Sequence, residues 1–416
     1  MKKLIHPLVA LVVLALGMVF VPSAEAKATY APTAGASFND PTGTRAEQRV
    51  LMDQIRGAVN NAPAGSIIRF VAYSFDYKPM ADALIAAKKR GVQVRLLIDS
   101  HTDTAQLAAL RKALGTNKSK SSYIRTCKYS CMANEPSFIH SKLYLFSRTG
   151  SAKYVSMISS ANPAETGISR SWNNTYTLVG DKTIYDANVD NFNDMLPDKT
   201  NTNYYHTVQS GAYKEYFFPR AGSTKNSDTL YNILNDVSCI DGSGKHTSIK
   251  LTTYFWTNLR VYLAQKLTAL KKAGCNVEVI YPDGSGKQNT IESKVTAELL
   301  GGNVPTYNTR PFKGLGRYVH NKEILIDGVY QGVSNQQIVY TTSQNLTMTS
   351  LRESNEVMLR IPLPDVYVAY AGNFARIKAN SVRVKSGAAK TTASVQSAIE
   401  TTSESARHDN DPDPDE

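Results

Sequence analysis

Two short runs of the sequence carry a histidine and a lysine separated by one residue. The first run holds His140 and Lys142, and the second holds His320 and Lys322. Each run is otherwise largely apolar and predicts a strand, in which alternate side chains share a face, so each histidine lies on the same face as its lysine. One imidazole can attack phosphorus while another protonates the leaving oxygen, and ammonium groups can hold the non-bridging oxygens. These residues therefore predict phosphoryl-transfer chemistry.

A serine and an asparagine follow each histidine–lysine pair. Ser160 and Asn162 lie in one predicted strand, and Ser343 and Asn345 lie in another. Alternation again places each serine on the face of its asparagine, and we expect all four side chains to bind phosphate. A metal site is less favoured, because the lysines supply cations where ligands are needed. The sequence predicts a site without a metal or other cofactor.

The elements that must position these residues occur twice. The first copy has a strand at 67–75, a helix ending at 88–90, Gly91, and a strand at 92–99. The second copy has a strand at 249–256, a helix through 270–272, Gly274, and a strand at 276–281. Gly91 and Gly274, with the lysine pairs before them, match at a constant offset of 183 residues. Strand, helix and parallel strand form a right-handed crossover unit, so the sequence predicts an internally duplicated α/β protein.

The composition of the chain is that of a globular protein, and its net charge favours an anionic partner. Of its 416 residues, 42% are hydrophobic and 20% are charged, which excludes a disordered protein. Its net charge of +12 favours partners that carry phosphate or carboxylate. The tail from Thr391 holds seven acidic residues and one arginine, so without it and the N-terminal segment the body has 44 basic and 27 acidic residues. That body carries +17.

The N-terminus has the pattern of a secretory signal peptide. Lys2 and Lys3 precede an apolar run at 8–21, and residues 24–26 read Ala-Glu-Ala, a small-residue cleavage pattern. The run is too short to favour a membrane span. We expect the mature protein to begin near Lys27 and to be secreted, to the periplasm or the extracellular space.

The two motifs resemble those of the phospholipase D superfamily. The second reads His-x-Lys-x4-Asp, and the resemblance covers about residues 45–385. It implies a bilobal, pseudo-twofold α/β fold with mixed sheets flanked by helices and one active site at the lobe interface. It also implies a metal-independent mechanism through a covalent phosphohistidine. The catalytic residues would be His140, Lys142, His320, Lys322 and Glu356.

The first motif departs from the family pattern at two places. Ser147 stands where the second motif has Asp327, but this position points away from the histidine face, so we expect Asp327 to be structural. Glu356 occupies the place of the carboxylate behind a histidine, and we expect it to support His320. The corresponding residue after the first motif is taken to be Thr175. His140 would then be the nucleophile and His320 the acid, although a carboxylate behind His320 would also favour it as nucleophile.

Three functions remain open. Export favours a secreted phospholipase D that contacts membranes peripherally, whereas the basic body, with Lys313 and Arg317 before His320, also suits a secreted nuclease. A degenerate phosphate-binding module is the third. Aromatic residues that end the predicted strands could border the substrate or pack in the core: Tyr73, Phe75, Tyr254 and Trp256. The remaining histidines of the mature chain are predicted to be surface residues: His101, His206, His246 and His408.

The cysteines and boundaries complete the prediction. Export to an oxidising compartment favours disulfides, which we expect to join Cys127 with Cys131 and Cys239 with Cys275. The chain is expected to be a monomer. Its parts are predicted as a signal peptide at 1–26, a first lobe at 27–200, a connection at 201–230, a second lobe at 231–386 and a disordered tail at 387–416.

Overall fold

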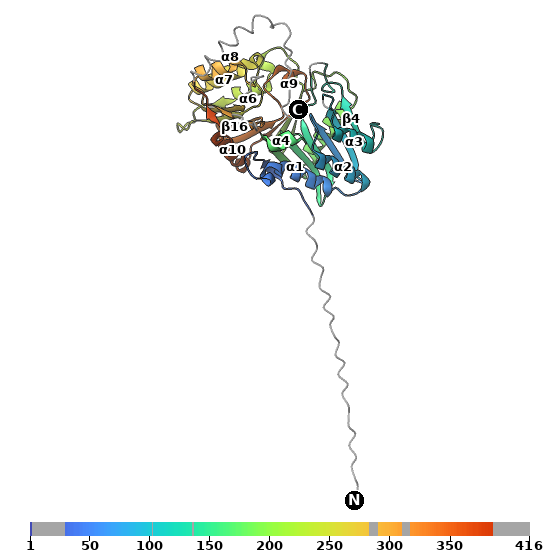
Figure 1. Ribbon diagram of the computed structural model, residues 1–416. Coiled ribbons are helices and arrows are strands. Elements are labelled where there is room, and N and C mark those ends of the chain that lie inside the picture. The colour runs from blue at the N-terminus through green and yellow to red at the C-terminus, as the bar shows by residue number, and fades with distance from the viewer. Residues whose placement is uncertain (2–29, 102, 135–136, 283–289, 310–316, 386–416) are drawn as a thin grey trace.

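The chain folds into two lobes that repeat one α/β architecture (Figure 1). The computed structural model describes residues 1, 30–101, 103–134, 137–282, 290–309 and 317–385. The predicted signal peptide, apart from residue 1, and the predicted tail lie outside these residues. Among the described residues, we find no helix with the length and apolar character that crossing a membrane requires.

The first lobe is built on a seven-stranded mixed sheet. Its strands, in spatial order, are β1 (Gly35–Phe38), β8 (Asn174–Val179), β6 (Ala152–Ser159), β5 (Lys142–Thr149), β2 (Ile67–Ala72), β3 (Gln93–Asp99) and β4 (Tyr123–Cys127). Its helices are α1 (Arg45–Asn60), α2 (Lys78–Lys89), α3 (Ala105–Leu114), α4 (Glu165–Ser169) and α5 (Lys182–Met195).

The second lobe repeats this order around a ten-stranded sheet. Its strands, in spatial order, are β19 (Val382–Arg383), β14 (Thr306–Thr309), β13 (Asn276–Pro282), β12 (Ser248–Thr252), β16 (Glu323–Tyr330), β17 (Val333–Thr342), β18 (Val357–Ile361), β10 (Tyr213–Phe217) and β9 (His206–Ser210), while β11 (Val237–Ser238) pairs with β16. Its helices are η1 (Lys225–Ser227), α6 (Thr229–Asn235), η2 (Asn258–Arg260), α7 (Val261–Lys272), α8 (Ser293–Gly301), α9 (Met348–Arg352) and α10 (Pro364–Ala379).

The duplicated units have the predicted topology. In each lobe two successive strands, β2 and β3 or β12 and β13, pair in parallel, and a strand that follows a histidine–lysine motif pairs antiparallel with the first of them. The crossover helix of each unit ends before a glycine. Gly91 and Gly274 have φ values of +90° and +100°, a backbone conformation in which a side chain is strained, so both positions favour glycine.

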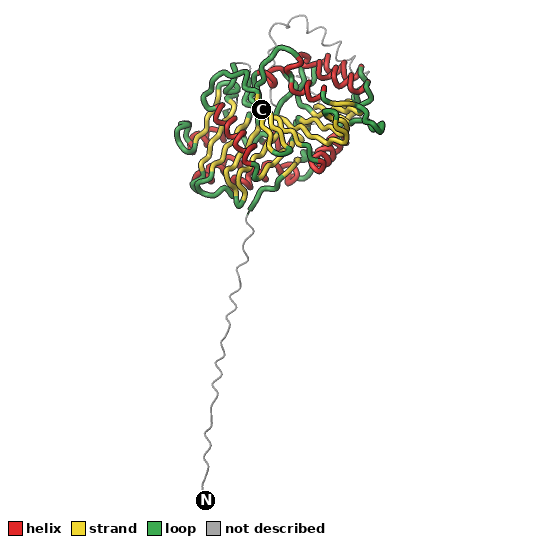
Figure 2. Tube along the Cα trace, turned by 180° about the vertical axis from the view of Figure 1, so that it is seen from behind, coloured by secondary structure: helices red, strands yellow, loops and turns green. Residues whose placement is uncertain are grey.

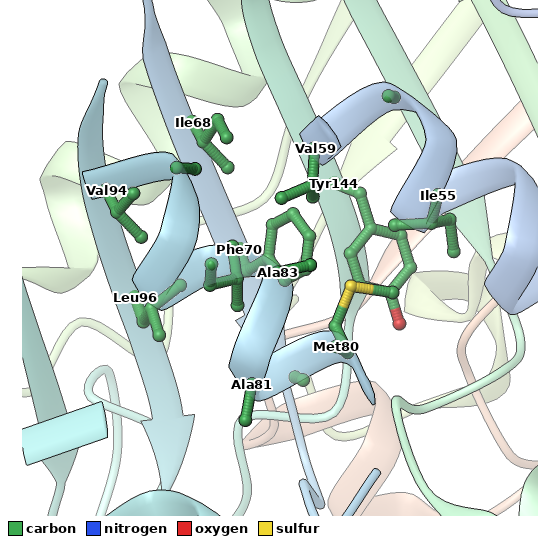
Figure 3. Close-up of a cluster of buried hydrophobic side chains, with 14 of the residues drawn as sticks. Ile55, Val59, Ile68, Phe70, Met80, Ala81, Ala83, Val94, Leu96 and Tyr144 are labelled. Atoms are coloured by element: carbon green, nitrogen blue, oxygen red, sulfur yellow. The ribbon is translucent and has the colours of Figure 1, made fainter. Parts of the chain in front are cut away.

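Apolar side chains form three clusters that hold the layers together. One face of the first sheet packs under α1, α2 and α3, where Phe70 and Tyr144 meet edge to face at 4.7 Å (Figure 3). One face of the second sheet packs against α6, α7 and α8. The third cluster joins the inner faces of both sheets with α5 and α10, so the lobes share a core. The helices of the first two clusters cover the other faces of the sheets (Figure 2). Each fully buried side chain of this kind contributes about 1.5–3 kcal/mol.

Part of the expected connection belongs to the second sheet. Strands β9 and β10 lie within 201–230, and β10 pairs antiparallel with β18 along 214–217 and 357–360. The sequence around them is rich in Tyr, Asn, Gly and Pro, which is typical of loops, but Tyr216 and Phe217 are buried and explain the pairing.

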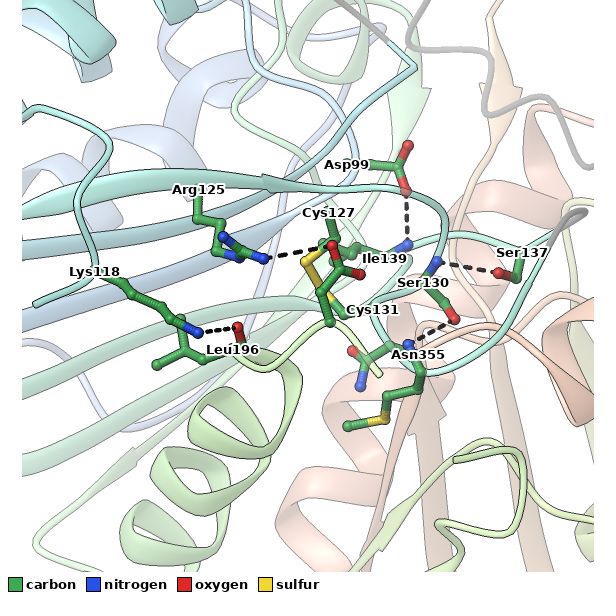
Figure 4. The surroundings of a disulfide bond; sticks show 12 residues. Asp99, Lys118, Arg125, Cys127, Ser130, Cys131, Ser137, Ile139, Leu196 and Asn355 are labelled. Atoms are coloured by element: carbon green, nitrogen blue, oxygen red, sulfur yellow. Dashed lines mark hydrogen bonds and ion pairs between the residues drawn. A yellow bond between two sulfur atoms is a disulfide. The ribbon is translucent and has the colours of Figure 1, made fainter. Parts of the chain in front are cut away.

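Both predicted disulfides are confirmed. Cys127 is bonded to Cys131 beside the segment that leads to the first motif (Figure 4), and Cys239 is bonded to Cys275. The first bond closes a turn in which Ser130 donates its backbone N–H to Ser137 Oγ at 3.1 Å.

Candidate active site

Each histidine motif is attached to the opposite lobe by its backbone. His140 N–H donates to Asn355 O at 3.0 Å, and His320 N–H donates to Trp172 O at 3.0 Å. Beside the second of these bonds, β15 (Tyr318–Val319) and β7 (Ser171–Trp172) form a two-stranded parallel sheet. Both motifs thus lie at one lobe interface. Strand β5 begins at Lys142 and β16 at Glu323, so the histidines lie just before these strands, whereas the sequence predicted them within strands.

His140 is backed by a carboxylate from the other lobe. Its Nδ1 lies 2.8 Å from Oε1 of Glu356, and both side chains are buried. The other carboxylate oxygen accepts a hydrogen bond from Ser343 Oγ. Burial would raise the pKa of Glu356, but the charge and hydrogen bond of His140, the charge of Lys142 and the Ser343 hydroxyl together lower it below its ordinary value. Glu356 is therefore a buried carboxylate that orients the imidazole of His140.

His320 is backed by an amide instead. Its Nδ1 lies 2.9 Å from Oδ1 of Asn173. Asn173 Nδ2 donates to Gly167 O at 3.1 Å, which turns the amide oxygen toward the ring, so Nδ1 of His320 is the donor. Its Nε2 lies 2.7 Å from Nζ of Lys322. The two histidines therefore differ in the charge behind them.

These contacts correct the predicted partners. Glu356 supports His140, not His320, because the residues behind each histidine come from the opposite lobe. The counterpart of Glu356 is Asn173, not Thr175, whose hydroxyl is hydrogen-bonded to Ser159 within the first sheet. The repeat offset of 183 residues, applied to Glu356, points to Asn173 and was the signal that could have identified it.

The predicted lysines and two of the four aromatic residues surround the histidines. Lys142 Nζ donates to His140 O at 2.8 Å and lies 5.6 Å from the Tyr73 ring centroid, and Tyr73 meets His140 edge to face at 5.6 Å. The second lobe repeats this arrangement, with Tyr254 5.3 Å from His320 and 5.7 Å from the Lys322 ammonium. Phe75 and Trp256 are buried in the cores instead.

The predicted phosphate-binding residues are buried beside the site. Ser160 Oγ donates to Asn173 Oδ1 at 2.8 Å, as Ser343 does to Glu356, so both serines hold the groups that back the histidines. Asn162 Oδ1 accepts a hydrogen bond from Tyr73 N at 3.1 Å. Buried Arg260 donates from Nη1 to Asn345 O at 3.1 Å, which fixes the loop that carries this asparagine.

The position that differs between the motifs lies away from the histidines. Asp327 contacts Lys245 at 3.4 Å and Gln337 at 3.2 Å on the sheet. Ser147 accepts a hydrogen bond from Ile67 N at 2.8 Å. Each side chain joins neighbouring chain segments, as expected of a structural position.

His101 is a residue at the site that the sequence reasoning placed on the surface. Its ring stacks on Tyr73 with centroids 3.6 Å apart, and its Nδ1 lies 2.7 Å from Asp99. The signal in the sequence was its place two residues after the aspartate that ends a parallel strand, where sites form in α/β sheets.

One set of described residues has the spacing of a metal site. It consists of Cys127, Cys131 and Asp198. Since the two sulfur atoms are bonded to each other, the thiolates that a metal requires are not formed there.

Comparison with known families gives a match to both repeats. The profile of a family described as cardiolipin synthase, PLD-like domain, matches residues 56–196 and again residues 238–378. No curated protein matches the chain significantly in sequence.

Solved structures share the fold at low sequence identity. Phosphatidylserine synthase from Haemophilus influenzae Rd KW20 is 14% identical, with a TM-score of 0.57, and the match covers 90% of this chain and 95% of that one. Polyphosphate kinase from Porphyromonas gingivalis is 13% identical, with a TM-score of 0.52 over 82% of this chain. This chain spans 49% of the kinase. Nuc from Salmonella typhimurium, a phospholipase D family member, is 16% identical over 42% of this chain and 98% of its own, with a TM-score of 0.31.

Proposed function

Because the chain belongs to the phospholipase D superfamily, we propose that it is a phosphodiesterase that hydrolyses or transfers phospholipid head groups through a phosphohistidine. The observation that carries the proposal is the reciprocal backing of the two histidines. Glu356 of the second lobe holds His140, and Asn173 of the first lobe holds His320. A single phosphate at this interface can therefore meet both imidazoles and both lysines.

His140 is the proposed nucleophile. Its Nε2 forms a bond to phosphorus while the bond from phosphorus to the leaving oxygen breaks. The ring becomes positively charged in the phosphohistidine, and the Glu356 carboxylate at Nδ1 stabilises that charge. Glu356 also fixes the tautomer that leaves Nε2 for attack.

His320 is the proposed acid and then base. In the structure its Nε2 faces Lys322 Nζ at 2.7 Å, so the acid step requires this ammonium to move to the phosphate oxygens and Nε2 to take up a proton. His320 then gives that proton to the leaving oxygen, and it later takes a proton from the water or alcohol that attacks phosphorus and breaks the bond to His140. Lys142 and Lys322 supply positive charge for the non-bridging oxygens. This sequence of steps balances without a metal ion. Isolation of a phosphorylated peptide from a slow substrate would test it: a label on His140 supports the assignment, and a label on His320 reverses it.

Phospholipid is the proposed substrate class. The matching family carries the description cardiolipin synthase, PLD-like domain. The phosphatidylserine synthase from Haemophilus influenzae shares the fold over 95% of its own length. The N-terminal signal pattern supports action outside the cytoplasm, on a membrane that the protein contacts peripherally. A nuclease is the second candidate, because the body carries +17 and nucleic-acid binding requires positive charge.

One assay separates these functions. Purified protein is incubated with phosphatidylcholine vesicles and, separately, with plasmid and single-stranded DNA, each in the presence of a chelator. Head-group release supports the phospholipase. DNA cleavage that is lost at high salt supports the nuclease, and activity on neither supports a binding module. A His320→Ala variant that folds normally and remains inactive ties the activity to this site.

A further inference from the structure

A second histidine–carboxylate pair lies beside the first. His101 Nδ1 is 2.7 Å from Asp99 Oδ1, and Asp99 is 2% exposed. This geometry resembles that of His140 and Glu356, whose corresponding distance is 2.8 Å. The side chain of His101 is 15% exposed, and its Nε2 is buried, as is Nε2 of His140.

The pair is fixed to the first motif at two points. Asp99 Oδ2 accepts a hydrogen bond from Ile139 N, next to His140, at 2.7 Å. Tyr73 stacks on His101 with an interplanar angle of 17° and centroids 3.6 Å apart, and its centroid is 5.6 Å from that of His140. The two imidazoles therefore lie no farther apart than these two distances combined.

The duplicated fold does not require this pair. At the repeat offset of 183 residues, Pro282 of the second lobe stands where the first lobe has Asp99. Among the described residues, a carboxylate at this strand end is thus found in the lobe that carries His140. A buried aspartate where the second repeat has a proline indicates a task on one side of the site.

We propose that His101 binds a second negatively charged group of the substrate, a phosphate or carboxylate close to the scissile phosphate. Asp99 accepts a hydrogen bond from Nδ1, so a ring whose Nε2 also donates to an anion carries both protons and makes a charge-assisted hydrogen bond. Tyr73 holds the ring in place. The inference rests on the proposed function, which it deepens: phospholipids that carry a second acidic group are preferred over those with one phosphate and a cationic head group.

Inhibition of a soluble substrate tests His101 without a membrane. Hydrolysis of bis(p-nitrophenyl) phosphate is measured with a chelator present, and phosphate and pyrophosphate are compared as inhibitors in the wild type, His101→Gln and His101→Phe. The phenylalanine keeps the ring on Tyr73 but has no donor. We expect the ratio of the phosphate inhibition constant to the pyrophosphate inhibition constant to fall about tenfold in both variants. The inhibition constant of phosphate should be unchanged. His246→Gln, a change at an exposed histidine of the second lobe, should retain the full advantage.

The outcomes decide the proposal in each case. Equal inhibition by the two anions in the wild type, or a pyrophosphate advantage that persists in His101→Phe, overturns it. Where a protein hydrolyses the soluble substrate too slowly, calorimetry of phosphate and pyrophosphate binding gives the same comparison. In vesicles, His101→Phe should slow cardiolipin cleavage relative to phosphatidylcholine. A wild type that cleaves neither lipid contradicts the proposed phospholipase, while the anion comparison still decides the role of His101.

Discussion

At the scale of single residues, the two halves of the site differ in the group behind each histidine. Glu356 is a buried carboxylate, whereas Asn173 offers a neutral oxygen in the equivalent place. The carboxylate orients the ring and would stabilise the charge that the ring acquires in the proposed intermediate. The neutral amide can only orient the ring of His320. The two positions should therefore respond differently to mutation.

Glu356→Gln should lower kcat by about 10²-fold or more, because the amide cannot stabilise a positively charged His140 ring. Steady-state and single-turnover kinetics with bis(p-nitrophenyl) phosphate would measure the loss. Glu165→Gln, at an exposed carboxylate of the first lobe, is the control and should leave kcat unchanged. Equal activity of Glu356→Gln and the wild type would contradict the proposed role of this carboxylate.

A second buried carboxylate lies next to the second motif. Glu323 accepts a hydrogen bond from Asn174 of the first lobe at 3.0 Å, and Leu143 stands at the matching place in the first lobe. Burial raises the pKa of Glu323 from 4.5 to about 7, against hydrogen bonds from Asn321, Asn174 and Thr252 that lower it. Folding thus favours the protonated form of this side chain.

Glu323 should make stability depend on pH. Since its folded pKa lies above the unfolded one, wild-type stability falls as the pH rises from about 4.5 to about 7 and is level above that. The loss amounts to as much as about 3 kcal/mol. Glu323→Gln should therefore gain stability over the wild type between about pH 5 and about pH 8 by urea denaturation. Glu298→Gln serves as control and should show no such gain. If the stability difference between Glu323→Gln and the wild type is the same at about pH 5 and about pH 8, the raised pKa of Glu323 is contradicted.

At the scale of elements, a buried ion pair joins the start of α6 to the loop after β17. Asp228 caps α6 by accepting from Leu230 N at 2.8 Å, and it pairs with fully buried Arg260 at 2.8 Å. Arg260 in turn donates to the backbone oxygens of Asn345 and Thr347. One guanidinium thus holds together a helix start and a loop of the site.

Asp228→Asn should destabilise the protein by about 3–5 kcal/mol, because removal of one partner leaves a buried guanidinium uncompensated. Urea denaturation measures the difference. The matched control is Asp82→Asn, which removes an exposed pair with Lys78 on α2 and should cost less than about 1 kcal/mol. Similar stabilities for the two variants would show that the buried pair has little net value.

The local elements were predictable because their signals are local. Gly91 and Gly274 end their helices as the sequence indicates, and the crossover units follow from apolar runs of strand length. The partners of the histidines depend instead on the docking of two lobes, which periodicity does not encode. Thr175 was a mistaken choice for the same reason: it lies within β8 and pairs with Ser159 of its own sheet, whereas Asn173 precedes the strand and its side chain reaches the other lobe.

At the scale of the whole molecule, the proposed site takes both histidines from one chain, so we expect that the loss of one is not compensated by another chain. A mixture of His140→Ala and His320→Ala proteins should show no more activity than either alone. The measurement is the rate on bis(p-nitrophenyl) phosphate at several protein concentrations, with each variant alone as control. Activity that appears on mixing would show that the site assembles between chains and would contradict the intramolecular site.

The backbone hydrogen bonds that His140 and His320 each make to the opposite lobe also have a consequence for how the sequence evolves. Each bond runs from one repeat to the other, in the reciprocal manner of two identical surfaces that meet across a twofold axis. A half-length chain with one motif could obtain such a bond only from a second copy of itself. In this chain the two copies differ, and a change of Glu356 is expected to alter the chemistry of His140, which it contacts across the interface. The halves of this gene can diverge in sequence, but they cannot diverge independently.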